Sequence, residues 1–430
     1  MQSLRNDFKF MNGNILVLTV TRVLGMFCRS MVFPYASLYI LALGGEPAQI
    51  GFVNSLRPLA GLIMFPIAGY ISDRAGRVKL IALGGYLSGF ALLLYVLAPS
   101  WEVIALAGLL QGFVVFQFPP TSAIIADSLS PQNRGKGIAT MNTLSGALAM
   151  FSPYLAGAVL DVHGENAGMR LLYGVLMVAL LLSATINLRF LQETSTHSTE
   201  KLSLSSLPGA FKSAYGGIPA MLRQLPRSLK ALAVVIALGF TSNAIASSFW
   251  VVYAKEQLGL GTKEWGLILL IDMLLRSLLN IPSGMIVDRY GRTRFILASL
   301  LLALVATPLF VFSSSFIQVL LVRAVIAVAN AFFTPACSAL MADTVPRAMR
   351  GRVMAAIGRG SVILGAATGG GTGGPGMGFL ITLPVMLGSI AGGYLYGRDP
   401  ASPWFFALGA TAISVLLAAL YLRDPKQAEI

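Results

Sequence analysis

Charged side chains are scarce in this sequence. Asp, Glu, Lys and Arg make up 11% of the 430 residues, whereas 56% are hydrophobic. That leaves too little polar side chain to cover a soluble globule of this size, so the composition excludes one. The mean hydropathy is +0.76, and apolar runs of about 20 residues recur, each long enough to cross a bilayer as a helix. We therefore predict an all-α integral membrane protein rather than a β-barrel.

Cysteine and histidine are nearly absent. Cys28 and Cys337 lie far apart in apolar segments, and His163 and His197 stand alone. This pattern predicts no disulfide framework, no metal site and no cofactor. The sequence also has no recognisable nucleophile–base pair, carboxylate dyad or Walker motif, which argues against an enzyme and against an ATP-driven pump.

Acidic residues are fewer than basic ones, and the net charge is +14. The Lys and Arg residues occupy short segments between apolar runs rather than a basic aromatic face, so no nucleic-acid partner is predicted. Such segments mark the cytoplasmic side of a membrane protein. We expect both termini in the cytoplasm, a multi-pass location in a prokaryotic plasma membrane, and a monomer. The start of the chain lacks the features of a cleaved secretory signal, so we expect the first span to be retained.

Two motifs occur twice. GYISDRAGRVK at 69–79 returns as GMIVDRYGRTR at 284–294, each residue 215 positions later (284 minus 69). SAIIADSLSPQNRGKG from Ser122 returns as SALMADTVPRAMRGRV from Ser338, at an offset of 216. Because two separate anchors share nearly one offset, we predict two similar halves, 1–191 and 231–430, joined by a cytoplasmic linker at 192–230. The linker reads as flexible chain, with a surface-lying amphipathic helix as the alternative.

Hydropathy predicts twelve spans, six in each half. The second half is longer: Gly135 to Gly157 covers 22 positions, whereas Gly351 to Gly393 covers 42. This difference indicates a Gly-rich insertion near 352–376, which we interpret as a flexible cytosolic loop, since the run lacks the Lys and Ser/Thr of a phosphate-binding loop. The predicted spans are about 14–43, 49–72, 80–98, 101–126, 137–160, 170–191, 231–253, 264–287, 295–312, 316–342, 377–396 and 404–422.

The repeated motif and the span count together resemble the major facilitator superfamily, with a pattern similar to its prokaryotic drug:proton antiporters. The resemblance implies parallel halves around one central site that opens alternately to either side. Span five carries Ser152, Pro153 and Gly157, a partial match to the exporters' glycine–proline motif, for which a packing kink is the alternative. The arginine that the family places in span four is missing, because Gly108 stands there.

The resemblance also assigns a conformational latch to the repeated loops. Glycine permits close helix approach, and an aspartate at a helix end can meet an arginine or the positive end of a neighbouring helix. The alternative is ordinary topogenic charge. The implied latch residues are Gly69, Asp73, Arg74, Gly76, Arg77, Asp127 and Arg134 in the first half, and Gly284, Asp288, Arg289, Gly291 and Arg292 in the second.

Ionisable residues inside spans are costly and mark functional sites. Asp272 is the clearest acidic one, and Arg276 lies four residues on, so a local ion pair is the simplest interpretation. The repeat offset relates Arg57 to Asp272, which suggests that they face each other. Further candidates for the substrate or coupling site are Arg29, Gln111, Gln117, Asn243, Trp250, Arg323 and Asn330.

We therefore expect a secondary active transporter that moves a small organic solute by alternating access, with proton-coupled efflux as the leading mode. An exchanger or symporter for anionic solutes remains open, because arginines outnumber acids inside the spans. A transporter-like receptor that binds without translocating is the alternative from another class.

Overall fold

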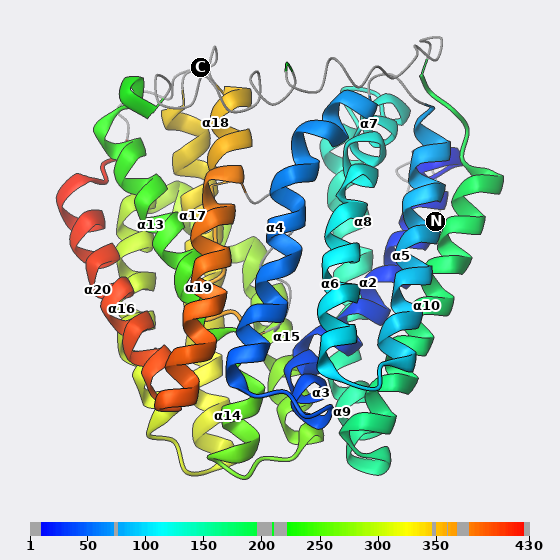
Figure 1. The fold of residues 1–430 in the computed structure, drawn as a ribbon. Coiled ribbons are helices and arrows are strands. Elements are labelled where there is room, and N and C mark those ends of the chain that lie inside the picture. Colours follow the sequence, from blue (N-terminus) through cyan, green and yellow to red (C-terminus); the bar gives the residue numbers. More distant parts are fainter. Residues whose placement is uncertain are drawn as a thin grey trace, which may run out of the picture.

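The computed structural model describes residues 10–72, 76–195, 209, 222–345, 350–358, 360–367 and 378–424. All the secondary-structure elements in these residues are helices (Figure 1). The first half contains α2 (Gly13–Val32), η1 (Phe33–Tyr35), α3 (Ala36–Ala42), α4 (Pro47–Ser72), α5 (Arg77–Leu97), α6 (Trp101–Phe113), η2 (Val114–Gln117), α7 (Phe118–Ser128), α8 (Arg134–Ala149), α9 (Ser152–His163) and α10 (Glu165–Phe190). The second half contains α13 (Arg227–Ala246), α14 (Trp250–Glu256), α15 (Thr262–Tyr290), α16 (Arg292–Val311), α17 (Phe316–Thr344), α18 (Arg350–Ile357), α19 (Phe379–Arg398) and α20 (Ser402–Tyr421).

In the described residues, 11 helical stretches are long and apolar enough to cross a membrane. They correspond to the predicted spans other than 49–72, where the 26-residue helix α4 lies. The all-helical membrane fold is therefore confirmed, whereas the count of twelve spans and the membrane sidedness stay predictions. Most of the linker and the Gly run at 369–377 lie outside the described residues.

Several predicted spans contain a break where proline occurs. The first is interrupted by a 3-10 turn at Phe33–Tyr35, the fourth by another at Val114–Gln117, and the fifth between Ala149 and Ser152. Proline has no N–H to donate and its ring crowds the preceding turn, so a helix bends or restarts there. The break before Pro153 fits a packing kink.

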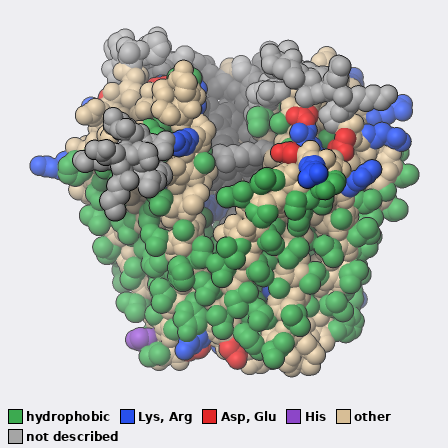
Figure 2. Space-filling model, turned by 180° about the vertical axis from the view of Figure 1, so that it is seen from behind, with side chains coloured by type: hydrophobic (Ala, Val, Ile, Leu, Met, Phe, Trp, Pro, Cys, Tyr) green, Lys and Arg blue, Asp and Glu red, His purple; other side chains and the backbone are tan. Residues whose placement is uncertain are grey.

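The two halves form two bundles that lie side by side (Figure 1). In the first, α5 packs on α10 and α4 on α6; in the second, α16 packs on α17 and α13 on both α19 and α20. The bundles meet along α4 with α19 and α9 with α15. Figure 2 shows an exterior covered by hydrophobic side chains between two ends where most charged ones gather, as expected for a bilayer-facing surface.

We call the end that carries Arg77 and Arg292 the basic end, and the opposite one, with the turns at Gly44 and Gly164, the far end. The first described helix begins at the basic end, where Asn14 Nδ2 donates to the Gln192 carbonyl at 3.0 Å. The last helix also ends there, since Asp424 contacts Arg292. Both described ends of the chain thus lie at one end of the bundle.

The halves touch closely at the far end because glycines bring backbones together. A Cβ on Gly393 would lie 2.6 Å from the Pro47 carbonyl, and one on Gly266 would lie 2.7 Å from Tyr35 Oη. Tyr35 Oη itself donates to the carbonyls of Pro153 at 2.7 Å and Thr262 at 3.0 Å, one in each half. The far end is closed in this structure.

Candidate functional site

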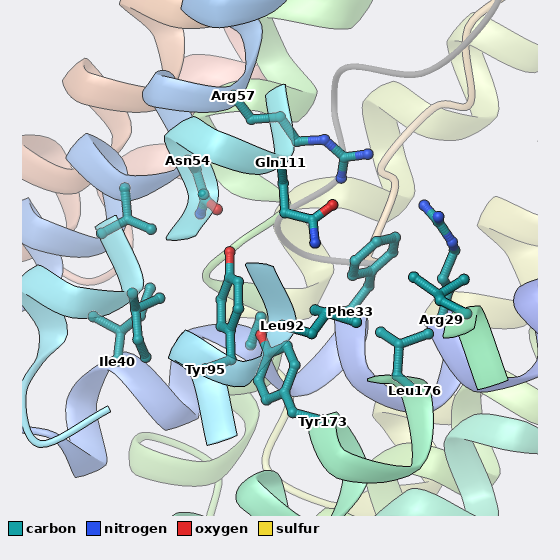
Figure 3. A pocket seen from close by; sticks show the side chains of 15 residues that line it. Arg29, Phe33, Ile40, Asn54, Arg57, Leu92, Tyr95, Gln111, Tyr173 and Leu176 are labelled. Atoms are coloured by element: carbon teal, nitrogen blue, oxygen red, sulfur yellow. The ribbon is translucent and has the colours of Figure 1, made fainter. Parts of the chain in front are cut away.

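A cavity in the first half holds several of the predicted site residues (Figure 3). It encloses about 690 Å³ of empty space, open solvent included. All of its lining residues come from the first half, and they include Arg29 of α2, Arg57 of α4 and Gln111 of α6. The predicted candidate Gln117 is not among them; its side chain packs against Gly84 of α5.

Arg29 and Arg57 approach the cavity from two helices, with Phe33 between them in the view of Figure 3. The Arg57 guanidinium lies 5.7 Å from the centroid of the Phe33 ring, a cation–π distance. Among the described residues, neither guanidinium has an ion-pair or hydrogen-bond partner. An unpaired cation in a membrane span costs about 3 kcal/mol, so the two guanidinium groups lie in the cavity without a compensating charge.

Several other residues of the cavity wall are fixed by contacts within the protein. Gln111 is held by Ser88, whose hydroxyl donates to Oε1 at 2.7 Å and whose carbonyl accepts from Nε2 at 2.8 Å. Tyr95 stacks on Tyr173 with ring centroids 4.4 Å apart. Asn54 reaches across to the second half and donates to Ser248 Oγ at 2.7 Å. The arginines therefore stand in a preformed pocket that also touches the other half.

A second charged group lies inside the second half. The fully buried carboxylate of Asp272 pairs with Arg276, one turn along α15, which agrees with the local ion pair expected from their spacing. It also lies 3.3 Å from Arg323 of α17, whose guanidinium stacks 4.8 Å above the Trp250 ring. The partners of Asp272 are therefore these two arginines, not Arg57 as the repeat offset suggested. Arg276 lies on the same helix as Asp272, and the packing of α15 against α17 brings Arg323 close to it.

The remaining candidates gather around a segment that the sequence analysis did not single out. Residues 360–367, from the predicted Gly-rich insertion, lie inside the second half rather than in a cytosolic loop. Asn330 Nδ2 donates to the Leu364 carbonyl at 2.8 Å and its Oδ1 accepts from Leu364 N–H at 2.6 Å. Asn243 bonds the same segment at Ile363 and Ala366. The predicted site residues thus fall into two groups, one in each half.

At the basic end the structure joins several of the predicted latch residues. Arg77 pairs with Asp127 and also donates to Thr194 Oγ1 at 2.9 Å. Arg134 donates to the Ala126 carbonyl at 2.9 Å. Glu193, which the sequence analysis missed, accepts from Val78 N–H at 3.1 Å and caps α5.

The second half repeats this arrangement. Arg292 pairs with Asp343, the repeat partner of Asp127, and lies 3.9 Å from Asp288. Asp424, also missed from sequence, accepts from the N–H groups of Arg292 at 3.1 Å and Thr293 at 3.0 Å.

The other predicted latch residues lie nearby or cannot be placed. Gly291 has φ +95°, a left-handed conformation that favours glycine, and Arg289 lies over Tyr290 at 5.3 Å. Gly69 lies in α4, Gly76 precedes α5, and Gly284 lies in α15 with open space around it. Asp73 and Arg74 lie outside the described residues.

Two bundles of membrane-length apolar helices, with two arginines lining an internal cavity, form an architecture typical of multi-pass membrane transporters. The sequence matches the family profile of the Major Facilitator Superfamily over residues 18–271 and 231–429. The chain belongs to this family, as the repeated motifs indicated, and its members move small-molecule substrates.

Relatives agree with this assignment. An uncharacterised MFS-type transporter of Methanocaldococcus jannaschii is 23% identical over 424 residues, 97% of each chain. The multidrug resistance protein MdtG of Citrobacter koseri is 24% identical over 340 residues, 75% of this chain and 78% of its own. The solved structure of a bacterial homologue of the iron transporter ferroportin, in its inward-facing state, has the same fold, with a TM-score of 0.69 at 15% identity over 95% of this chain and 98% of that one.

Proposed function

We propose that this protein is a secondary transporter of small organic solutes that carry an anionic group, and that Arg29 and Arg57 bind that group. The observation that carries the proposal is the pair of guanidinium groups without counter-charge in the cavity of the first half. Guanidinium binds carboxylate or phosphate through two parallel hydrogen bonds, which gives both affinity and orientation. Phe33, Tyr95 and Tyr173 supply an apolar wall for an aromatic body.

We further propose export from the cytoplasm, coupled to protons. The basic end is then cytoplasmic by the positive-inside rule, and the closed far end makes this the inward-facing state. The name of one relative, the multi-drug resistance efflux pump PmrA homolog of Lactococcus lactis, supports export. Asp272 is the candidate proton carrier, because its carboxylate is fully buried and its Oδ1 has no hydrogen-bond partner among the described residues.

Transport of two dyes with one ring system and opposite charge tests the proposal. In proteoliposomes, we expect the anion fluorescein to move at least tenfold faster than the cation rhodamine 123. Arg29→Gln and Arg57→Gln should each weaken fluorescein affinity about tenfold to a hundredfold, since a hydrogen bond to a charged group contributes about 1.5–3 kcal/mol.

Arg22→Gln is the matched control. Arg22 lies on α2 like Arg29, but it donates to Asn142 Oδ1 at 2.7 Å and does not line the cavity. We expect this variant to keep wild-type affinity for fluorescein. Equal rates for the two dyes, or unchanged affinity in folded Arg29→Gln and Arg57→Gln, would contradict the anion site.

A further inference from the structure

Residues 360–367, which we call the plug, interrupt what would otherwise be one span. Helix α18 ends at Ile357, α19 begins at Phe379, and Gly378 packs directly against the end of α18. The intervening chain leaves the helix axis, with φ of +91° at Gly358 and +81° at Gly360, values that glycine adopts without strain. Residues 360–367 are therefore a non-helical segment between α18 and α19.

The plug packs against three helices of the second half. Val362 contacts Gly239 of α13, and Gly365 lies against Ile326 of α17 and the ring of Trp250 in α14. Val362, Leu364 and Ala367 are all buried, at 3%, 7% and 3% exposure. Non-helical backbone is tolerated at membrane depth only where protein or a water-filled cavity surrounds it, and the plug meets this condition through its neighbours.

Side chains satisfy the backbone of the plug in place of regular secondary structure. Asn330 binds both the N–H and the carbonyl of Leu364. Asn243 accepts from Ala366 N–H at 3.0 Å. Arg323 Nη1 donates to the Gly365 carbonyl at 2.6 Å. Side chains of Asn243, Asn330 and Arg323 thus hold the plug, and none of these contacts is part of a helix's own backbone hydrogen bonding.

The repeat relates this arrangement to the cavity of the first half. Position 323 corresponds to position 108 (323 minus 215), and Gly108 lines the open cavity. In the second half the same place carries Arg323, 2% exposed, and the Gly365 carbonyl sits on its guanidinium. The guanidinium thus donates both to this neutral carbonyl oxygen and toward the Asp272 carboxylate, 3.3 Å away, and an oxygen of an anionic solute could take the place of the carbonyl. The plug also borders a separate cavity of the second half, which Leu364 and Gly365 line together with residues of α13, α16 and α20.

We infer that the plug occupies a substrate-binding position in the second half. During the transport cycle it moves away from α13, α14 and α17, and Arg323 then binds the anionic group of the solute. This inference rests on the proposed function for the identity of the solute. The movement of the plug can be tested without any solute.

An engineered disulfide can lock the plug in its seat. An ideal Cβ on Gly239 lies 3.6 Å from the Val362 Cβ, inside the 3.5–4.5 Å range of disulfides. In a background of Cys28→Ala and Cys337→Ala, we expect oxidised Gly239→Cys/Val362→Cys to lose at least tenfold in fluorescein transport and to regain it on reduction. Transport by the oxidised form at the reduced rate would overturn the inference.

A second disulfide in the same half is the control. A Cβ on Gly388 of α19 lies 3.2 Å from the Cβ of Ala244 in α13, so a shift of a few tenths of an ångström brings this pair into the disulfide range. Ala244→Cys/Gly388→Cys then links two helices of this half without touching the plug. We expect its oxidised form to transport within twofold of its reduced form. An equal loss in both oxidised proteins would mean that stiffening this half, rather than seating the plug, stops transport, and would overturn the inference.

Hydrogen exchange tests the movement of the plug independently of the identity of the solute. Peptides that cover 360–367 should exchange faster than peptides from α13 and α17, and the Gly239–Val362 disulfide should slow them at least tenfold. If no form moves fluorescein but the plug peptides behave this way, the proposed solute class fails while the movement of the plug stands. Equally slow exchange with and without the disulfide would overturn the inference that the plug moves.

Discussion

The carboxylate of Asp161, in the first half, accepts a 3.1 Å hydrogen bond from the backbone N–H of Thr262, in the second half. Its other oxygen accepts from Lys263 N–H at 3.3 Å. Thr262 is the first residue of α15, where the N–H groups have no partner inside the helix and the helix dipole is positive. One half therefore caps a helix of the other, a contact that separation of the halves at the far end would break.

Asp161→Ala should shift the protein toward the state that is open at the far end. Loss of a cap costs about 1 kcal/mol, or about fivefold in population. The measurement is maleimide labelling of Ser248→Cys in a background without Cys28 and Cys337, because Ser248 is buried at the contact with Asn54.

Glu264→Ala is the matched control for Asp161→Ala. Glu264 Oε2 accepts from Gly261 N–H at 2.9 Å and caps the same helix from within its own half, so this contact persists in both states. Labelling of Ser248→Cys should stay at its original rate in Glu264→Ala. A similar rise in both variants would show that the cap only stabilises α15.

Gly266→Ala should keep the far end from closing. The added methyl group would lie 2.7 Å from Tyr35 Oη, and overpacking of this kind costs about 1–3 kcal/mol. We expect slower transport and faster Ser248→Cys labelling. Gly174→Ala, on α10 with nothing within 4 Å of the new methyl, should change neither, and normal transport by Gly266→Ala would argue that the halves do not need this approach.

Loss of the ion pair between Arg77 and Asp127 should lower the transport rate rather than the folding stability. Asp127 is 45% exposed in its side chain, and such pairs contribute about 0–1 kcal/mol to folding. If the pair positions the basic-end loops for closure, Asp127→Asn should slow transport severalfold while dye binding survives. Charge reversal, Arg77→Asp with Asp127→Arg, should recover part of the rate; full activity in Asp127→Asn would remove the latch role.

Asp272→Asn should uncouple transport from a pH gradient while sparing solute exchange, because exchange needs no net proton movement. Removing one partner of a buried pair costs about 3–5 kcal/mol, so Asp272→Asn alone could fail to fold. In that case the double variant Asp272→Asn/Arg276→Gln removes one of the two arginine charges left without a partner. Glu264→Gln, at the exposed start of the same helix, is the control. Gradient-driven uptake that persists in Asp272→Asn would exclude this residue as the proton carrier.

The sequence alone determined the class, the two-part repeat and most helix positions of this protein. A helix that crosses a membrane is specified locally, by about 20 consecutive apolar residues, and the repeat at 69–79 and 284–294 is visible in the letters themselves. The ion pair of Asp272 with Arg276 could also be predicted from the sequence, because the two residues are four positions apart on one helix.

Only the tertiary structure decided which distant groups meet. Asp272 and Arg323 are 51 positions apart, and Asp161 and Thr262 are 101 apart (262 minus 161), so their contacts depend on how helices from different segments pack. Residues 360–367 precede a Gly-rich run that reads as flexible chain, yet Asn243, Asn330 and Arg323 hold them inside the bundle. Hydropathy reports how each segment partitions into the bilayer, whereas a binding site depends on side chains that several segments bring to one place.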